Sequence, residues 1–163
     1  MNIKGAQPSG IDITGDPILQ HMVNTYPRLF QGSIPQSHSY VQPGWKNLVD
    51  DLCFRTDRML IRDQARLFAV RQIKDKLGTL LFYFSFGSAM EQLYTEREST
   101  RAGEEVLYVS GGRNAETAAK IRAAIKVAIS RSNATCLVCS QPGRMHDLSG
   151  LLSVRCDEHS SAR

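Results

Sequence analysis

The chain has 163 residues, of which 42% are hydrophobic and 22% charged, as is ordinary for a single globular domain. Its net charge of +4, with a pI near 9.0, permits nucleic-acid binding without requiring it. Residues 1–16 lack the apolar core of a secretory signal, and no stretch approaches the length of a membrane-spanning helix. We therefore expect a cytoplasmic protein, in which four cysteines indicate a metal site or free thiols rather than disulfides.

The first third of the sequence predicts a tail followed by two helices. Residues 1–15 contain glycine and proline but few apolar side chains, and we interpret them as a flexible tail before a single domain over 16–163. Asp16 and Pro17 have the pattern of an N-cap and a first helical residue. A second helix should begin near Gly44. Its predicted apolar face consists of Trp45, Leu48, Val49, Leu52, Thr56, Met59 and Leu60.

A β-hairpin is predicted after the second helix, because apolar residues alternate with period two. Its strands should cover Leu67 to Ile73 and Thr79 to Phe86, with the turn at Lys74 to Gly78. The second strand has apolar residues on both faces, so we expect it to be covered on both sides. Residues 87–113 are predicted as an insertion loop containing a short third strand at Val106 to Val109.

A long amphipathic helix is the next predicted element. It should run from Ala115 to about Ser132, with Asn114 at its N-cap and an apolar stripe every third or fourth residue. Together these elements predict an α+β fold, with helices packed on a small antiparallel sheet or hairpin.

Two pairs of metal-binding residues follow this helix. Cys136 and Cys139 form one pair, Cys156 and His159 form the second, and sixteen residues separate the pairs. Two ligands two residues apart can curl around one ion, and two such pairs can complete a tetrahedron, the geometry that zinc prefers. The sequence therefore predicts one structural Zn²⁺ per chain, bound in a C-terminal zinc knuckle.

Other readings of these residues are weaker. A catalytic zinc would need an open coordination position, which four protein ligands do not leave. A redox Cys-x-x-Cys usually opens a helix, where the dipole lowers a thiol pKa, whereas this pair follows a helix. His146 could replace His159, but its spacing fits poorly, and we expect it to be an exposed loop residue.

Four short motifs resemble those of a family of small uncharacterised proteins common in phages, prophages and bacteria. They are Gly44-Trp45, the hairpin segment Lys74 to Tyr83, the segment Cys136 to Gly143, and Cys156-Asp157-Glu158-His159. The chain departs mildly from the family pattern, with Asp75 for Glu, Leu77 for Phe and Ser140 for Gly. The resemblance implies a zinc-stabilised α+β domain, and a phage origin would imply interference with a host machine in the host cytoplasm.

Several residues are candidates for contact with a partner. Lys74 and Lys76 are expected at the hairpin turn, while Arg122 and Lys126 share a face of the long helix, and Arg144 lies on the zinc loop. A solvated turn and the polar side of an amphipathic helix are the ordinary alternatives. Trp45 and Cys53 are expected in the core.

Three functional hypotheses follow, and the sequence contains no complete catalytic constellation. The leading hypothesis is a non-enzymatic binding protein, phage- or prophage-encoded, that acts on a host protein complex of defence or nucleic-acid processing. The second is a nucleic-acid-binding zinc protein that uses the basic face of residues 114–132 and the zinc loop. The third is an enzyme whose site is assembled from residues distant in sequence.

Overall fold

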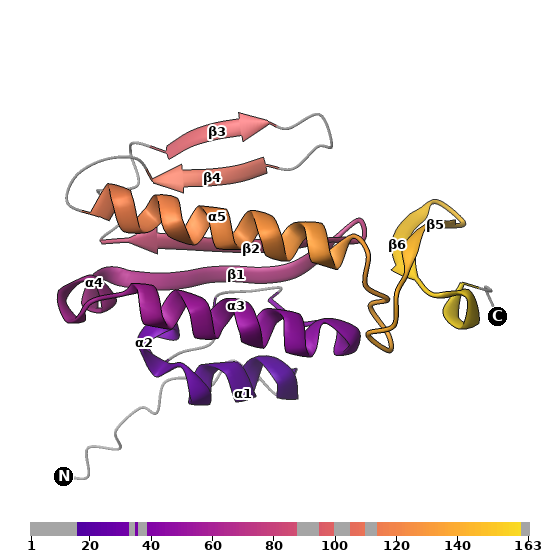
Figure 1. Ribbon diagram of the computed structural model, residues 1–163, viewed down its shortest axis with the longest axis horizontal. Coiled ribbons are helices and arrows are strands. Elements are labelled where there is room, and N and C mark those ends of the chain that lie inside the picture. The colour runs from indigo at the N-terminus through magenta and orange to yellow at the C-terminus, as the bar shows by residue number, and fades with distance from the viewer. Residues whose placement is uncertain are drawn as a thin grey trace, which may run out of the picture.

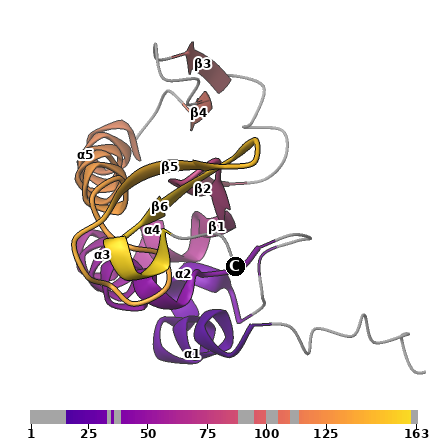
Figure 2. The same cartoon turned by 90° about the vertical axis from the view of Figure 1, so that its right-hand side faces the viewer.

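The computed structural model describes residues 16–32, 35, 39–87, 95–99, 105–109 and 114–160. In this part of the chain the fold is α+β, as the sequence predicts. Two long helices, α3 (Lys46–Met59) and α5 (Ala115–Ser132), lie side by side across one face of a hairpin (Figures 1 and 2). The predicted tail, residues 1–15, lies outside the described residues.

The N-terminal helices pack beside α3. Asp16 caps α1 (Pro17–Thr25), because its Oδ1 accepts hydrogen bonds from the backbone of Ile18 at 2.9 Å and Leu19 at 3.2 Å. Its second carboxylate oxygen accepts the backbone N–H of Val41, which ties the following loop to the helix start. A one-turn helix, α2 (Pro27–Phe30), was not predicted and begins at the proline that limits α1.

The second predicted helix begins with a 3₁₀ turn, η1 (Pro43–Trp45), and continues as α3. Trp45 is buried, as expected. A short helix, α4 (Arg62–Leu67), comes next, and the side-chain oxygen of Gln64 accepts the backbone N–H of Ile61 at its start. The prediction that Leu67 begins a strand is wrong, because that residue ends α4.

The central hairpin has a tighter turn than predicted. Its strands are β1 (Phe68–Lys76) and β2 (Thr79–Phe86), so the turn contains only Leu77 and Gly78. Both residues have positive φ, 54° and 81°, as a two-residue hairpin turn requires. Asp75 stabilises the turn, since its Oδ1 accepts the Gly78 N–H at 2.7 Å. The predicted placement of Lys74 and Lys76 at the turn is therefore wrong, and both belong to β1.

A second hairpin follows α5 and was not predicted. It consists of β5 (Arg144–Leu148) and β6 (Leu151–Arg155), joined by Ser149 and Gly150 at φ 58° and 90°. Here Asp147 Oδ1 accepts the Gly150 N–H at 2.6 Å. The same Asp-x-x-Gly spacing thus closes both hairpins.

The segment 87–113 contains more structure than the insertion loop that was predicted. Strand β4 (Glu105–Val109) includes the predicted third strand, and it pairs antiparallel with β3 (Thr95–Ser99), which was not predicted. Most of the rest of this segment lies outside the described residues.

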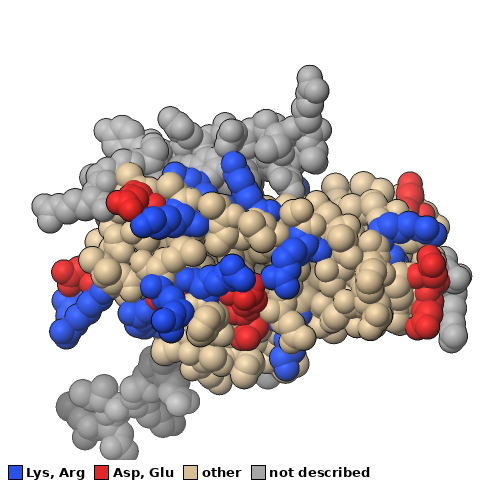
Figure 3. Space-filling view, in the orientation of Figure 1, with Lys and Arg blue, Asp and Glu red and all other residues tan. Residues whose placement is uncertain are grey.

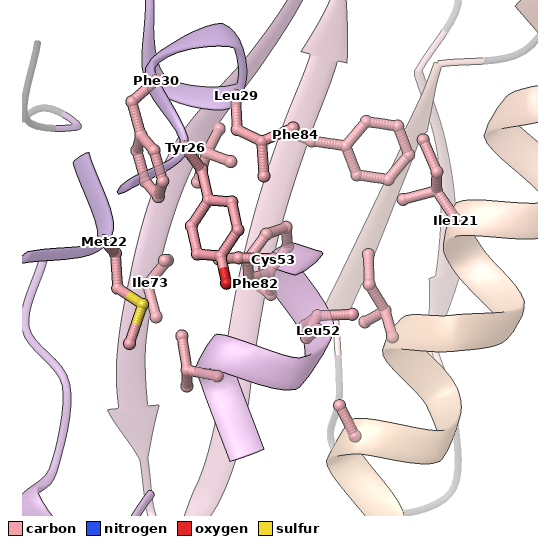
Figure 4. Packing of buried hydrophobic residues seen from close by; sticks show 14 of the residues in the cluster. Met22, Tyr26, Leu29, Phe30, Leu52, Cys53, Ile73, Phe82, Phe84 and Ile121 are labelled. Atoms are coloured by element: carbon pink, nitrogen blue, oxygen red, sulfur yellow. The ribbon is translucent and has the colours of Figure 1, made fainter. Parts of the chain in front are cut away.

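The main core lies between the helices and one face of the β1–β2 hairpin (Figure 4). The Phe68 ring stacks on Phe84 and meets Phe86 edge-on, both with ring centroids 5.3 Å apart. Leu81, on the opposite face of β2, is also buried, as the apolar pattern of that strand predicts. Cys53 is fully buried, and burial raises the pKa of its thiol, so it is the small core residue that was expected.

The long helix α5 has the predicted bounds. Asn114 occupies the N-cap position, although its side chain makes no capping hydrogen bond. At the other end, the buried Ser132 hydroxyl donates to the Ile129 carbonyl at 2.7 Å and accepts the Leu80 N–H at 3.1 Å. The C-terminus of α5 is therefore joined to the start of β2.

Candidate metal centre

The first ligand pair lies on a tight turn just after α5. The backbone N–H of Cys136 donates to the Gln141 carbonyl at 2.8 Å, and the N–H of Ser140 donates to the Cys136 carbonyl at 3.0 Å. These bonds fold residues 136–141 into a closed loop, which we call the knuckle. They place the Cys136 and Cys139 thiols in the same cluster.

The second ligand pair follows β6. A single 3₁₀ turn, η4 (Asp157–His159), comes directly after Cys156, and the His159 N–H donates to the Cys156 carbonyl at 3.1 Å. Strand β6 is itself tied to the knuckle, because the Leu137 N–H donates to the Val154 carbonyl at 3.1 Å. This contact brings the second pair against the first.

The four side chains form one compact cluster, called here the Cys₃His cluster. Its ligand atoms all lie within 4.8 Å of one another. The Cys139 and Cys156 sulfurs are 3.6 Å apart, and His159 Nδ1 lies 3.1 Å from the Cys156 sulfur and 3.7 Å from that of Cys136. In a tetrahedral site with metal–nitrogen bonds of about 2.0 Å and metal–sulfur bonds of about 2.3 Å, two sulfurs are about 3.8 Å apart and a nitrogen and a sulfur about 3.5 Å apart. The separations of 3.6 and 3.7 Å are close to these values, and the one of 3.1 Å is shorter. The cluster therefore has the dimensions to hold one four-coordinate metal ion, with Nδ1 as the imidazole donor.

The two thiols of the knuckle have pKa values shifted in opposite directions. Burial opposes ionisation of Cys136, but backbone N–H groups of Cys156, Cys139 and Val138 outweigh it and lower the pKa of this thiol to about 6. The Gln141 N–H also favours a Cys139 thiolate, yet burial and the neighbouring thiols prevail and raise the pKa of Cys139. One thiolate thus makes the next harder to form, and a bound cation relieves this repulsion.

The Gly44-Trp45 motif packs against the knuckle and donates two hydrogen bonds to the backbone of residues 135–137. The Gly44 N–H donates to the Leu137 carbonyl at 2.8 Å, and the indole N–H of Trp45 donates to the Thr135 carbonyl at 3.1 Å. A Cβ atom on Gly44 would overlap the Cys136 carbonyl oxygen and lie 2.7 Å from the carbonyl carbon of Leu137. Glycine is required here because two backbones meet without space for a side chain.

The turn of the β1–β2 hairpin contacts the same end of the molecule. A Cβ atom on Gly78 would lie 2.8 Å from the Met145 sulfur and 3.3 Å from the Ser153 Cα. A Cβ atom on Gly143 would lie 2.9 Å from the Cys136 nitrogen and 3.0 Å from the Arg155 carbonyl oxygen. Gly44 and Gly143 therefore lie against the knuckle, and Gly78 lies against the β5–β6 hairpin.

The predicted contact residues lie on three elements, β1, α5 and β5. Lys74 and Lys76 lie near the end of β1, and Arg144 pairs with Asp157 at 3.2 Å beside the metal centre. Arg122 and Lys126 lie roughly three and two helical turns before the end of α5. The basic patch expected from these residues stays a prediction.

His146 is neither a cluster member nor an exposed loop residue. It lies on β5 opposite Ser153, where its side chain is partly buried and its Nε2 has no hydrogen-bond partner. The expectation of an exposed loop residue is wrong, because residues 144–155 form a hairpin that was not predicted. Its absence from the cluster leaves His159 as the imidazole ligand among the described residues.

Comparisons with protein-family models, with curated proteins and with solved structures found no match for this chain. Within the part of the chain that the structure describes, no helix has the length and hydropathy needed to cross a bilayer. Function must therefore be inferred from the geometry of the described residues.

The substitution Gly44→Ala tests the contact between η1 and the knuckle. We expect a loss of at least about 3 kcal/mol in unfolding free energy, because the added methyl overlaps backbone atoms that no rotamer change can move. Chemical denaturation measures this loss. Asn47→Ala, an exposed change in the first turn of α3, is the control and should change stability by less than about 0.5 kcal/mol. Equal stability of the two variants would contradict the close approach of Gly44 to the backbone of Cys136 and Leu137.

The substitution Ser140→Gly tests the backbone strain in the knuckle. Ser140 has φ 68°, a left-handed conformation that costs a non-glycine residue about 1–2 kcal/mol. After the entropy cost of glycine, we expect a net gain of about 0.5–1 kcal/mol. Ser130→Gly, an exposed change within α5, should instead destabilise by about 0.5 kcal/mol. In thermal denaturation, the melting temperature should rise in Ser140→Gly and fall in Ser130→Gly. A change in the same direction in both variants would contradict the left-handed conformation of Ser140.

Proposed function

We propose that this chain is a non-enzymatic protein-binding module whose C-terminal end is stabilised by one structural zinc ion. The observation that carries the proposal is the Cys₃His cluster, whose four donors come from two chain segments held together by the knuckle and β6. Four protein donors complete a tetrahedral shell, so an ion bound by all of them has no position left for water or substrate. An ion held in this way supports structure rather than catalysis.

Zinc is the metal that suits these donors best. Three thiolates and one imidazole are soft to borderline ligands, and a Cys₃His set is one of the standard structural zinc sites. Calcium and magnesium prefer oxygen ligands, which the cluster does not offer. The thiol–thiol separation of 3.6 Å also suits zinc–sulfur bonds of about 2.3 Å.

The substitution Cys139→Ser tests the zinc site. Zinc content measured by mass spectrometry should fall from about one ion per chain to near zero. Because the binding free energy of structural zinc is also folding free energy, the melting temperature should fall by about 10 °C or more, as a loss of roughly 4 kcal/mol implies.

Cys53→Ala is the matched control for that experiment. Cys53 is the cysteine outside the cluster, so this variant should keep its zinc even if the core cavity lowers its stability. Unchanged metal content in Cys139→Ser, or equal loss in both variants, would refute the site.

A protein partner is favoured by the apolar side chains on the surface. Val127 on α5 is 57% exposed, and Phe54 on α3 is 49% exposed. Large apolar side chains in such positions contribute to protein interfaces more readily than to contacts with phosphate. The resemblance to phage and prophage proteins supports a host protein complex as the target, in defence or nucleic-acid processing.

Affinity capture tests the class of partner. The tagged, zinc-loaded chain is incubated with bacterial host lysate, with and without nuclease. We expect a protein to be retained in near-stoichiometric amount in both samples, because contacts between proteins do not depend on nucleic acid. The control is the Cys139→Ser variant, whose metal-binding end should be misfolded. Retention that disappears with nuclease would overturn the proposal.

A nucleic-acid-binding function is the second candidate. It is favoured by the charge of α5, which carries Lys120, Arg122, Lys126 and Arg131 against the single acid Glu116. Phosphate contacts are strongest at low salt, so binding to DNA or RNA should be detectable at about 50 mM salt and weaken steeply above it. Undetectable binding at that salt concentration would exclude this candidate.

A further inference from the structure

A groove runs between α3 and α5 on the face turned away from the β1–β2 hairpin. In the space-filling view, cationic side chains and one acidic patch lie among uncharged surface over these two helices (Figure 3). The residues that line it are Asp51, Leu52, Arg55, Met59, Lys120, Ala123, Ala124, Val127, Ala128 and Arg131. None of them belongs to the Cys₃His cluster.

The floor of the groove is apolar. Ala123 and Ala124 are too small to fill the space beside α3, while Leu52 and Met59 contribute larger apolar side chains from the opposite helix. Val127 is 57% exposed, although the core-facing positions of the same helix are buried. This helix therefore presents Ala123 and Val127 at the surface, beside the stripe that it buries in the core.

The rim of the groove is cationic. Arg55, Lys120 and Arg131 line it, and Asp51 is the one acid among the lining residues. Lys120 also pairs with Glu116, one turn earlier on α5, at 2.7 Å, and this pair is exposed. Asp51 is shared between two of these cations, with its Oδ2 3.1 Å from Arg55 Nε and 2.9 Å from Arg131 Nη1. These pairs are substantially exposed, so they contribute little to stability and can exchange with an incoming carboxylate at small cost.

We propose that the α3–α5 groove binds an acidic amphipathic helix of the protein partner. Its apolar side chains, spaced three and four residues apart, cover Val127 and the alanines, and its carboxylates pair with Arg55, Lys120 and Arg131. This inference rests on the proposed protein-binding function. Two neighbouring helices can bind a third helix, because the groove between them accepts a ridge of side chains from the third.

Charge and polarity select this occupant over the alternatives. A second copy of the chain would bring the same cationic rim and another net charge of +4, so the two rims would repel. A nucleic acid would satisfy the rim but would leave the apolar floor unpaired. An acidic amphipathic helix can pair its carboxylates with the rim and its apolar side chains with the floor.

A displayed library of helical peptides tests the proposal. Peptides of about 20 residues, with apolar, acidic and basic residues varied over their surface, are selected against the full-length, zinc-loaded chain. Enriched peptides should be acidic and should carry apolar residues at helical spacing. The best of them is then synthesised, and its dissociation constant is measured by fluorescence anisotropy.

Three variants locate the binding surface. Val127→Glu places a charge on the floor and should weaken binding at least about tenfold, as expected for a central interface residue. Leu151→Glu makes the same kind of change at an equally exposed apolar residue of the β5–β6 hairpin, and should leave binding within about twofold. Lys120→Glu should weaken binding severalfold and reduce its dependence on salt. Zinc content and melting temperature of each variant confirm that it is folded.

The outcomes separate this inference from the proposed function. Three results would overturn the proposal that the groove binds an acidic helix. They are enrichment of basic peptides, no enrichment above an unrelated control protein, and binding that is insensitive to Val127→Glu. A protein retained in affinity capture would still support the proposed function in those cases. Capture that is lost with nuclease, together with acidic peptides that bind the groove, would overturn the proposed function and leave the groove standing.

Discussion

The C-terminal end of this fold depends on the closure of the Cys₃His cluster. A two-stranded hairpin as short as β5–β6 is marginal by itself, and several of its large apolar side chains, including Leu151 and Leu152, are exposed. What fixes it are the bond from Leu137 to Val154, the packing of Gly78 against Met145, and four metal donors on either side of the hairpin. A metal ion bound by the cluster would therefore stabilise this part of the chain, which is too short to build a core of its own.

Backbone contacts explain why glycines lie at the approaches to the metal centre. Gly44 and Gly143 each bring one backbone directly against another at the knuckle, and Gly78 brings the hairpin turn against β5 and β6. A metal ion can close the cluster only if these segments come close, and side chains at those positions would hold them apart. The glycine-containing segments therefore allow the knuckle and the β5–β6 hairpin to pack closely. Residues that contact a partner are expected at other positions.

The sequence predicted the elements whose signals are local. Asp16-Pro17, the apolar stripe of α5 and the spacing of the four metal ligands each depend on a few neighbouring residues, and the structure contains all three. The β5–β6 hairpin was missed because its strands are short and its apolar residues do not alternate with period two. The Asp-x-x-Gly spacing shared by Asp75 and Asp147 would have indicated both turns. The α3–α5 groove depends on two helices from distant parts of the sequence, which no local pattern brings together.

Helix α5 connects the two surfaces of interest. Its buried stripe fixes it on the hairpin, its Val127 side lines the groove, and its C-terminus continues into the knuckle. Arg131 lines the groove and lies within the last turn before that knuckle, while the neighbouring Ser132 binds Leu80. A metal ion bound by the Cys₃His cluster would restrain the end of α5, and with it the position of the groove residues relative to α3. A ligand of the groove and a metal ion that both favour this arrangement must stabilise each other's binding, since such coupling is reciprocal.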